Sequence, residues 1–368
     1  MDSVDILIIG AGIAGASLGA ALAPRRRVLV TEAEDWPGRH ATGRSAAFWH
    51  EGYGGPLVAP LTRASRPVLE AGGYLSPRGA IHIARAGEGI EIVPGCAVEP
   101  LNRPALERLL PGLRPEWVRG LAEPALADID VSRLHNDYLA ELRANGGAVR
   151  TGMRLASAER RGERWRARFD GGEEVAAEVI VNAAGAWADT VAERCGVRPL
   201  GIAPKRRTMV QLRLGRSGCK RLPLVVAADG SFYFKGEGER SIWLSPHDEV
   251  ATDPCDAAPE ELDVAVAIDR FSQVVDWPVE RVERSWAGLR SFAPDRLPVF
   301  GFGSDEPEFF WCAGQGGFGI QTAPAAAALC AALILGEGEM PVDPAPYDPG
   351  RFSSSFLGEM SRSDRGVR

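Results

Sequence analysis

Three glycines near the amino end, followed by one acidic residue, have the types and spacing needed to bind a dinucleotide. Residues 10–15 (GAGIAG) form a GxGxxG motif, and Glu32 follows about 20 residues later. In such a motif the glycines allow a tight turn, a close approach to a pyrophosphate and close packing of a helix on a strand. A helix amino end attracts phosphates, and an acid accepts hydrogen bonds from ribose hydroxyls. The predicted nucleotide contacts are Gly10, Gly12, Ile13, Ala14, Gly15, Glu32 and Ala33.

Two later segments favour FAD over a nicotinamide dinucleotide. Residues 40–45 (HATGRS) are suited to cross a pyrophosphate and reach a flavin ring, and residues 311–322 are glycine-rich and precede an alanine-rich helix. A helix amino end stabilises the negative charge of reduced flavin. The predicted contacts are Thr42, Gly43, Arg44, Ser45, Ala46, Gly314, Gly316, Gly317, Gly319, Ile320, Gln321 and Thr322. Residues 39–47 contain no cysteine or tyrosine for covalent attachment, so we expect non-covalent FAD, with His40 as the one alternative.

The elements that must position these residues alternate between strand and helix at both ends of the chain. Residues 5–9 are typical of a buried parallel strand, and residues 13–23 predict a helix that ends at Pro24. Further strands are predicted at 28–30, 154–159, 164–169, 175–182, 206–214, 231–244, 297–300 and 309–312, and further helices at 134–143, 186–195, 260–275 and 322–335. The predicted fold is α/β, with a Rossmann-type FAD-binding domain from residues 1–75, 125–203 and 293–345. An inserted α+β substrate domain (76–124 and 204–292) has an antiparallel or mixed sheet, and 346–368 form a tail.

Composition excludes several other classes of protein. The 368 residues are 45% hydrophobic and 25% charged, which is typical of a globular protein. The net charge of -7 argues against nucleic-acid binding. The cysteines lack a CxxC spacing and the histidines lack HExxH, so we predict neither a metal site nor disulfides. The uncharged run 6–24 is rich in glycine and follows two aspartates, so we expect a cytoplasmic protein without stable membrane insertion.

Together these motifs resemble those of FAD-dependent amine and amino-acid oxidoreductases of the D-amino-acid oxidase type. The resemblance extends from Asp5 to about Leu335, and its order and spacing are most similar to those of bacterial D-arginine dehydrogenases. The matching segments are 10–17 (GAGIAGAS), 40–47 (HATGRSAA), 182–189 (NAAGAWAD), 204–207 (PKRR), 231–235 (SFYFK), 286–295 (WAGLRSFAPD) and 314–322 (GQGGFGIQT). The resemblance adds Ala183, Gly185 and Trp187 to the expected cofactor contacts.

The same resemblance implies a substrate site. Arg290 is expected to bind the substrate carboxylate, with Arg207 as a second arginine, because a guanidinium makes two parallel charge-assisted bonds. Tyr53 and Tyr233 are expected to line the site, and the carbonyl of Gly316 or Gly317 to accept from the substrate amine. The implied reaction is hydride transfer from the α-carbon of a D-amino acid to flavin N5, giving an imino acid and then a 2-oxo acid and ammonia. The electron acceptor (oxygen, a quinone or another) and the oligomeric state stay open.

Two departures from the arginine-specific relatives bear on the substrate. Ala80 stands where they carry a glutamate that pairs with the guanidinium, and Phe48 stands where they carry a histidine. Since an unpaired buried charge is costly, we expect neutral D-amino acids to be preferred to D-arginine. His50 and Glu51 lie in the same segment and receive no role.

Two other functions are compatible with these residues. One is oxidation of a secondary amine or of glycine, sarcosine or proline, which would use the same arginine. The other is a non-catalytic flavoprotein or an RNA-modification module, and the acidic composition disfavours RNA.

Overall fold

The βαβ unit predicted at the amino end is present in the computed structural model, which describes residues 2–352. Strand β1 (Asp2–Ile9) leads into helix α1 (Ile13–Leu22) and then strand β2 (Val28–Thr31). Leu7 and Ile9 pack into one buried cluster, while Ile6 and Ile8 pack into another. Since successive side chains of a strand point to opposite faces, β1 is buried on both sides, as in the centre of a parallel sheet.

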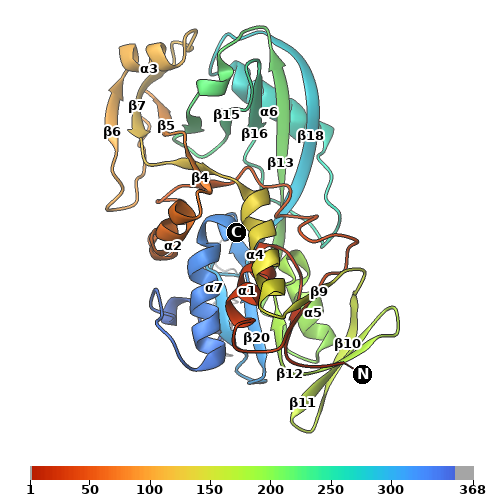
Figure 1. The fold of residues 1–368 in the computed structure, drawn as a ribbon. Helices are drawn as coiled ribbons and strands as arrows, with labels where there is room; N and C mark the ends of the chain where they lie inside the picture. Colours follow the sequence, from red (N-terminus) through yellow and green to blue (C-terminus); the bar gives the residue numbers. More distant parts are fainter. Residues whose placement is uncertain (1, 353–368) are drawn as a thin grey trace, which may run out of the picture.

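An eight-stranded sheet is built around β1. Its parallel strands are β9 (Ala148–Arg150), β2, β1, β12 (Glu174–Asn182) and β20 (Phe309–Ala313), and its antiparallel strands are β10 (Leu155–Arg161), β11 (Arg164–Phe169) and β19 (Val299–Phe302). Helices α1 and α7 (Gly319–Leu335) contribute to the core on one face, and α5 (Ala188–Arg194) contributes to the core on the other. Helix α4 (Val131–Ala144) packs beside α1. We call this unit the α/β lobe; it is the lower half of Figure 1.

A ten-stranded sheet dominates the upper half of Figure 1, which we call the β lobe. Its strands, in order, are β21 (Gln315–Gly316), β18 (Val279–Phe292), β13 (Ala203–Leu214), β16 (Ser241–Ser245), β15 (Tyr233–Gly236), β14 (Leu224–Ala227), β5 (Ala80–Arg85), β7 (Trp117–Glu123) and β6 (Glu99–Asn102), with β17 (Val250–Ala251) beside β13. The pairs are antiparallel except β14 with β5. Helices α3 (Arg103–Leu109) and α6 (Glu261–Ser272) contribute Leu106, Ala267 and Phe271 to its core.

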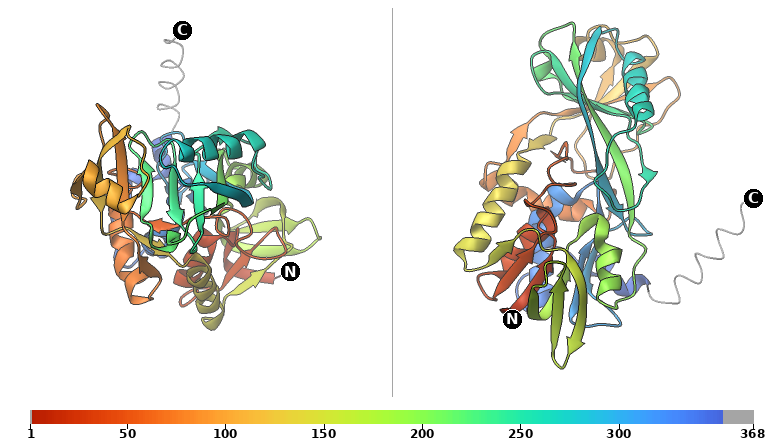
Figure 2. Two further views of the ribbon diagram at one scale, coloured as in Figure 1. Left: turned by 90° about the horizontal axis from the view of Figure 1, so that it is seen from above. Right: turned by 90° about the vertical axis from the view of Figure 1, so that its right-hand side faces the viewer.

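Two long strands connect the lobes. Strands β13 and β18 pair along their length and run from the β lobe down to the α/β lobe, as the right-hand view of Figure 2 shows. Their lower ends meet β21, where Ser291 pairs with Gly316 and Phe292 with Gln315. The fold is completed by a three-stranded sheet and by helix α2 (Ala59–Ala71). The strands of this sheet, in order, are β3 (Phe48–Trp49), β8 (Ala127–Ile129) and β4 (Leu75–Pro77). Short 3-10 turns lie at Gly185–Trp187, Cys219–Arg221, Ala345–Tyr347 and Pro349–Phe352.

The α/β fold with a mixed second sheet, predicted from the sequence, is confirmed. The alternating segment 231–244 is divided into strands β15 and β16, because the chain bends between them at residues 238–240. Helix α2 was not predicted, since Pro67 inside it obscures the helical pattern. Within residues 2–352, no helix combines the length and hydropathy required to cross a bilayer.

Candidate active site

The glycine motif forms a turn that only glycine permits. Gly10 has a φ of 106°, and a Cβ there would lie 2.5 Å from the carbonyl oxygen of Ala183, at the end of β12. A Cβ on Gly15 would lie 1.9 Å from the carbonyl oxygen of Gly10. The turn therefore fits tightly between the parallel strands and the first turn of α1, which leaves the amino end of the helix beside the strand ends.

Glu32 and Thr42 both accept hydrogen bonds from backbone N–H groups of this motif. The Glu32 carboxylate accepts hydrogen bonds from the backbone N–H of Ala11 at 3.0 Å and of Glu34 at 3.1 Å. The hydroxyl of Thr42 accepts from the N–H of Ile13 at 3.0 Å. The segment around Thr42 thus crosses the start of α1, as expected of a loop that covers a pyrophosphate.

One cavity extends from this turn to the lower ends of β13 and β18, and we call it the inter-lobe cavity. Of the predicted cofactor residues, its walls include Gly10, Gly12, Ile13, Ala14, Glu32, Ala33, Thr42, Arg44, Ser45, Ala46, Ala183, Gly185, Trp187, Gly316, Gly317, Gly319 and Ile320. Of the predicted substrate residues, they include Arg207, Tyr233, Arg290 and Gly316. The structure therefore brings the two predicted sites together in one space.

Six predicted residues of the described chain lie outside this lining: Gly15, Gly43, Tyr53, Gly314, Gln321 and Thr322. The Gln321 amide donates to the Thr62 hydroxyl at 2.9 Å and to the Tyr53 carbonyl at 3.3 Å, and the Thr322 hydroxyl donates to the Phe318 carbonyl at 2.9 Å. A Cβ on Gly43 would lie 2.7 Å from the Gly38 carbonyl oxygen. Gly43, Gln321 and Thr322 therefore support the walls from behind, whereas the Tyr53 hydroxyl reaches the wall residue Gly317, where a Cβ would lie 2.3 Å from it.

The guanidinium of Arg44, which was predicted as a cofactor contact, binds protein atoms at the edge of the cavity. It donates to the carbonyls of Ala257 at 2.9 Å and Ala287 at 3.0 Å, and it pairs with Asp256. Because Ala287 belongs to β18, Arg44 fastens the loop over the glycine turn to the long strand of the β lobe.

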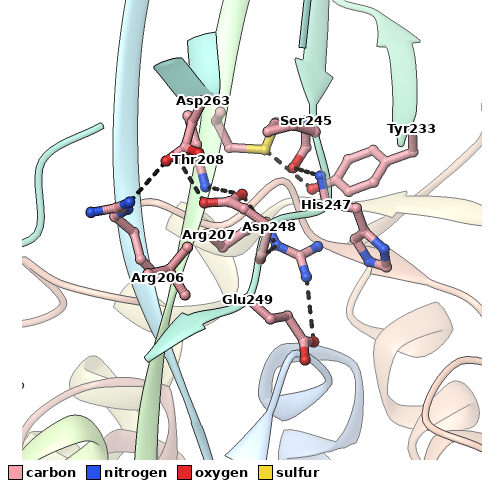
Figure 3. Close-up of polar contacts among 12 residues, drawn as sticks. Arg206, Arg207, Thr208, Tyr233, Ser245, His247, Asp248, Glu249 and Asp263 are labelled. Atoms are coloured by element: carbon pink, nitrogen blue, oxygen red, sulfur yellow. Dashed lines mark hydrogen bonds and ion pairs between the residues drawn. The ribbon is translucent and has the colours of Figure 1, made fainter. Parts of the chain in front are cut away.

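The two arginines share one wall of the inter-lobe cavity. The Arg207 Nε donates to the Asp248 carbonyl at 2.8 Å, and its Nη2 lies 3.5 Å from a Glu249 carboxylate oxygen (Figure 3). Burial, and then the charge of Arg290, lower the pKa of Arg207. Among the described residues, the Nη1 atoms of Arg207 and Arg290 are buried and have no hydrogen-bond partner. The two Nη1 groups are therefore free to donate hydrogen bonds to an anion in the cavity.

Aromatic and apolar side chains surround these arginines. The Tyr233 hydroxyl donates to Met209 Sδ at 3.1 Å, and the ring of His247 lies edge-on at 5.7 Å from that of Tyr233. Burial and the charges of Arg207 and Arg290 lower the pKa of His247 to about 3, so its imidazole is neutral near pH 7. The guanidinium of Arg290 lies 5.9 Å from the ring centre of Tyr53.

Several cavity residues were not predicted. Most of them lie outside the motifs: Met153, Arg154 and Leu155, Thr190 and Arg194, and Cys255 and Ala257; Gly288 and Leu289 lie inside the segment 286–295 but were not assigned a role. The neutral His247, and Asp248 and Glu249 behind Arg207, were also missed. Tertiary packing brings the residues outside the motifs to the cavity, so no local spacing identifies them.

A model of the DAO family, described as FAD dependent oxidoreductase, matches residues 5–333. This chain belongs to that family. The DAO-family cofactor is FAD, and a solved DAO-like structure, L-alpha-glycerophosphate oxidase from Mycoplasma pneumoniae, has FAD bound. The residues present fit this cofactor, because the glycine turn, the amino end of α1 and Glu32 open into a single cavity that reaches Arg290.

Curated relatives match only part of the chain. The hydrogen cyanide synthase subunit HcnC of Pseudomonas aeruginosa is 29% identical over 233 residues, which are 62% of this chain and 54% of that subunit. Glycine oxidase of the same organism is 29% identical over 179 residues, which are 48% of this chain and 46% of that enzyme. The chain thus matches about half the length of these DAO-family relatives.

Solved structures share the whole fold. L-proline dehydrogenase from P. horikoshii has a TM-score of 0.82 and 19% identity, covering 96% of this chain and 99% of that one. Glycine oxidase from Geobacillus kaustophilus has a TM-score of 0.79 and 21% identity, covering 95% of this chain and 99% of that one. The fold of the chain therefore agrees with its membership of the FAD dependent oxidoreductase family.

Proposed function

We propose that this enzyme oxidises a small amino acid with an uncharged side chain, of D configuration where the α-carbon is chiral. The observation that carries the proposal is the pair of buried, unpartnered Nη1 atoms of Arg207 and Arg290 in the wall of the inter-lobe cavity. A buried donor without a partner costs roughly 1–3 kcal/mol, and more when it is charged. A substrate carboxylate would remove that cost by accepting from both guanidinium groups.

The cavity residues suggest how the rest of the substrate is held. With the carboxylate on the arginines, the carbonyl of Gly316 or Gly317 would accept from the amine, and Tyr53 and Tyr233 would flank the α-carbon. When bound, FAD supplies the acceptor for the α-hydrogen as hydride. His247 stays neutral because its pKa is lowered to about 3, so it adds no further positive charge near the two arginines.

The side-chain class follows from the apolar neighbours of Tyr233. Met209 and Tyr233 line the cavity and belong to a buried apolar cluster with Ala80, Leu126 and Leu224, against which Phe48 packs. Such surroundings favour an apolar side chain, at about 0.8 kcal/mol for each buried methylene, and disfavour a guanidinium. The motifs that the sequence shares with oxidoreductases of the D-amino-acid oxidase type support the D configuration and the carboxylate contact, and the apolar neighbours of Tyr233 support neutral side chains.

A second candidate is the oxidation of glycine or of a secondary amine such as sarcosine or proline. It is favoured by the match to glycine oxidase of Pseudomonas aeruginosa and by the shared fold of L-proline dehydrogenase from P. horikoshii. The same arginine pair would bind the carboxylate, so the two candidates differ only in the amine and the side chain that the cavity admits.

An anaerobic substrate screen separates these possibilities. The holoenzyme is mixed with D-leucine, D-methionine, D-phenylalanine, D-arginine, glycine, sarcosine and both enantiomers of proline, and the bleaching of the flavin is followed. Fast bleaching by neutral D-amino acids supports the proposal, whereas preference for glycine, sarcosine or L-proline assigns the second candidate. A higher kcat/KM for D-arginine than for D-leucine would contradict the neutral side-chain class. If dithionite bleaches the flavin and no amino acid does, the protein is not an amino-acid oxidoreductase.

A further inference from the structure

Two histidines and a glutamate meet in the β lobe, outside the lining of the inter-lobe cavity. His50 follows β3, His82 lies in β5 and Glu123 ends β7. Strands β5 and β7 pair so that Ala80 is opposite Glu123. Because His82 is two residues from Ala80, His82 and Glu123 share one face of the sheet. The segment after β3 brings His50 to that face.

The three side chains converge on a common point. The Nε2 atom of His50 lies 2.9 Å from Oε2 of Glu123, and Nε2 of His82 lies 3.3 Å from the same oxygen. One ligand atom from each residue lies within 4.8 Å of the others. Around a tetrahedral zinc ion, with bonds of about 2.0–2.2 Å, neighbouring ligand atoms are roughly 3.3–3.5 Å apart. Small shifts of the side chains would therefore give zinc geometry.

Hydrogen bonds within the group leave one polar atom unsatisfied. Glu123 is 2% exposed and His82 is 8% exposed. The Glu123 Oε1 atom is buried and, among the described residues, has no hydrogen-bond partner. A carboxylate oxygen buried without a partner is costly, and a bound cation is one way to satisfy it.

We propose that His50, His82 and Glu123 bind a divalent transition-metal ion, of which zinc is the best match. Two imidazole nitrogens and one carboxylate are the ligand types that zinc accepts, and they leave a fourth position for water. The ion would fasten the segment after β3 to strands β5 and β7. The ring of His50 stacks on that of Tyr53, with centres 6.0 Å apart, so the ion would also fix Tyr53 beside Arg290.

Metal content of the purified holoenzyme tests the proposal. A tag-free protein is expressed with zinc supplementation, dialysed against metal-free buffer and analysed by elemental mass spectrometry, with flavin content as the measure of folded protein. The wild type should retain about one zinc ion per flavin. The zinc content of His82→Gln and of Glu123→Gln should fall to background. The matched control is Glu51→Gln, which removes a neighbouring carboxylate that pairs with Arg63, and it should retain the metal.

Calorimetric titration of zinc into chelator-treated holoenzyme provides a measurement that does not depend on expression. The assignment is supported if zinc binds at one site in the wild type and in Glu51→Gln, and if its affinity is at least 10-fold weaker in His82→Gln and Glu123→Gln. No binding to the wild type, or equal binding to all four proteins, overturns it. Loss of D-arginine turnover in Glu123→Gln without a change in metal content also overturns it, because the carboxylate would then bind a cationic substrate side chain.

Discussion

Arg207 and Arg290 are diagonal neighbours on one face of the antiparallel pair β13–β18, where Arg290 lies opposite Lys205 and Arg207 lies opposite Gly288. Diagonal neighbours of this kind are roughly 7–8 Å apart, so the two guanidinium groups can reach the two ends of one small anion. Their mutual repulsion is part of the reason that the pKa of Arg207 is lowered. The carboxylate of the proposed substrate would relieve that repulsion.

Removing Arg290 should impair turnover far more than folding. Arg290→Ala loses a charge-assisted contact worth on the order of 3 kcal/mol, so kcat/KM for the best amino acid should fall by about 100-fold or more. Steady-state kinetics and flavin content measure the two effects separately. Arg281→Gln is the control, because Arg281 lies on the same strand with a side chain that is 62% exposed. Near-normal kinetics of Arg290→Ala with every amino acid would remove Arg290 from the site.

The third glycine of the motif should not tolerate a methyl group. In Gly15→Ala the new Cβ would lie 1.9 Å from the Gly10 carbonyl oxygen, so α1 must move away from the turn. Such overpacking costs about 1–3 kcal/mol or more, and we expect a lower melting temperature and loss of FAD. Gly89→Ala is the control, because a Cβ there meets nothing within 4 Å. Equal melting temperatures and equal flavin content of the two variants would refute this account of the turn.

The neutral histidine beside the arginines should make the protein sensitive to acid. The pKa of His247 is about 3 in the folded state, whereas that of an unperturbed histidine is 6.5. Between these two values the unfolded chain binds a proton that the folded chain does not. The free energy of unfolding should therefore decrease as the pH falls from about 6.5 towards 3, by at most about 1.4 kcal/mol per pH unit from this group.

Replacing His247 tests that contribution. His247 has a φ of 56°, which asparagine adopts more readily than most residues. Denaturant titrations of His247→Asn between about pH 6.5 and pH 5 should give a shallower decrease than the wild type. The pKa of His135 is also lowered by burial, and this background contribution is present in both proteins. Parallel curves would show that His247 titrates normally.

FAD should be held without a covalent bond, and Glu32 should contribute to its affinity. Acid precipitation should release all the flavin into the supernatant, and colour that stays in the pellet would point to His40. Glu32→Gln should raise the Kd for FAD by about 10–100-fold, since a charged hydrogen-bond acceptor is worth roughly 1.5–3 kcal/mol. Asp35→Asn, at an exposed position in the next loop, should leave the Kd unchanged. Flavin fluorescence during reconstitution of each apoprotein measures the Kd for FAD of both variants.

The cofactor half of the fold could be predicted because its determinants are local. A glycine turn between a strand and a helix, and an acid at the end of the next strand, are close in sequence, and the structure has them adjoining in space. Arg44 was also recognised as important, but the partners of its guanidinium could not be foreseen. Ala257 and Ala287 are more than 200 residues away, with separations of 213 and 243.

The group formed by His50, His82 and Glu123 could not be predicted from the spacing of residues in the sequence. The sequence lacks every short zinc motif, and we predicted no metal site on that ground. His82 and Glu123 are 41 residues apart, and they meet because β5 and β7 pair. Their proximity depends on a strand register that composition and periodicity do not determine, and β5 and β7 were themselves not predicted.

The regular pairing of β13 with β18 limits where insertions and deletions can be tolerated in these strands. The pairing advances one residue at a time from Ala203 to Gln211, and the irregularities come only later, between Gln211 and Leu212 and between Arg213 and Leu214. A single inserted or deleted codon between Ala203 and Arg207 would turn one arginine to the opposite face of the sheet. Length variation among natural homologues should therefore accumulate at the end of this strand pair near Leu214, where an extra residue leaves the arginine pair undisturbed.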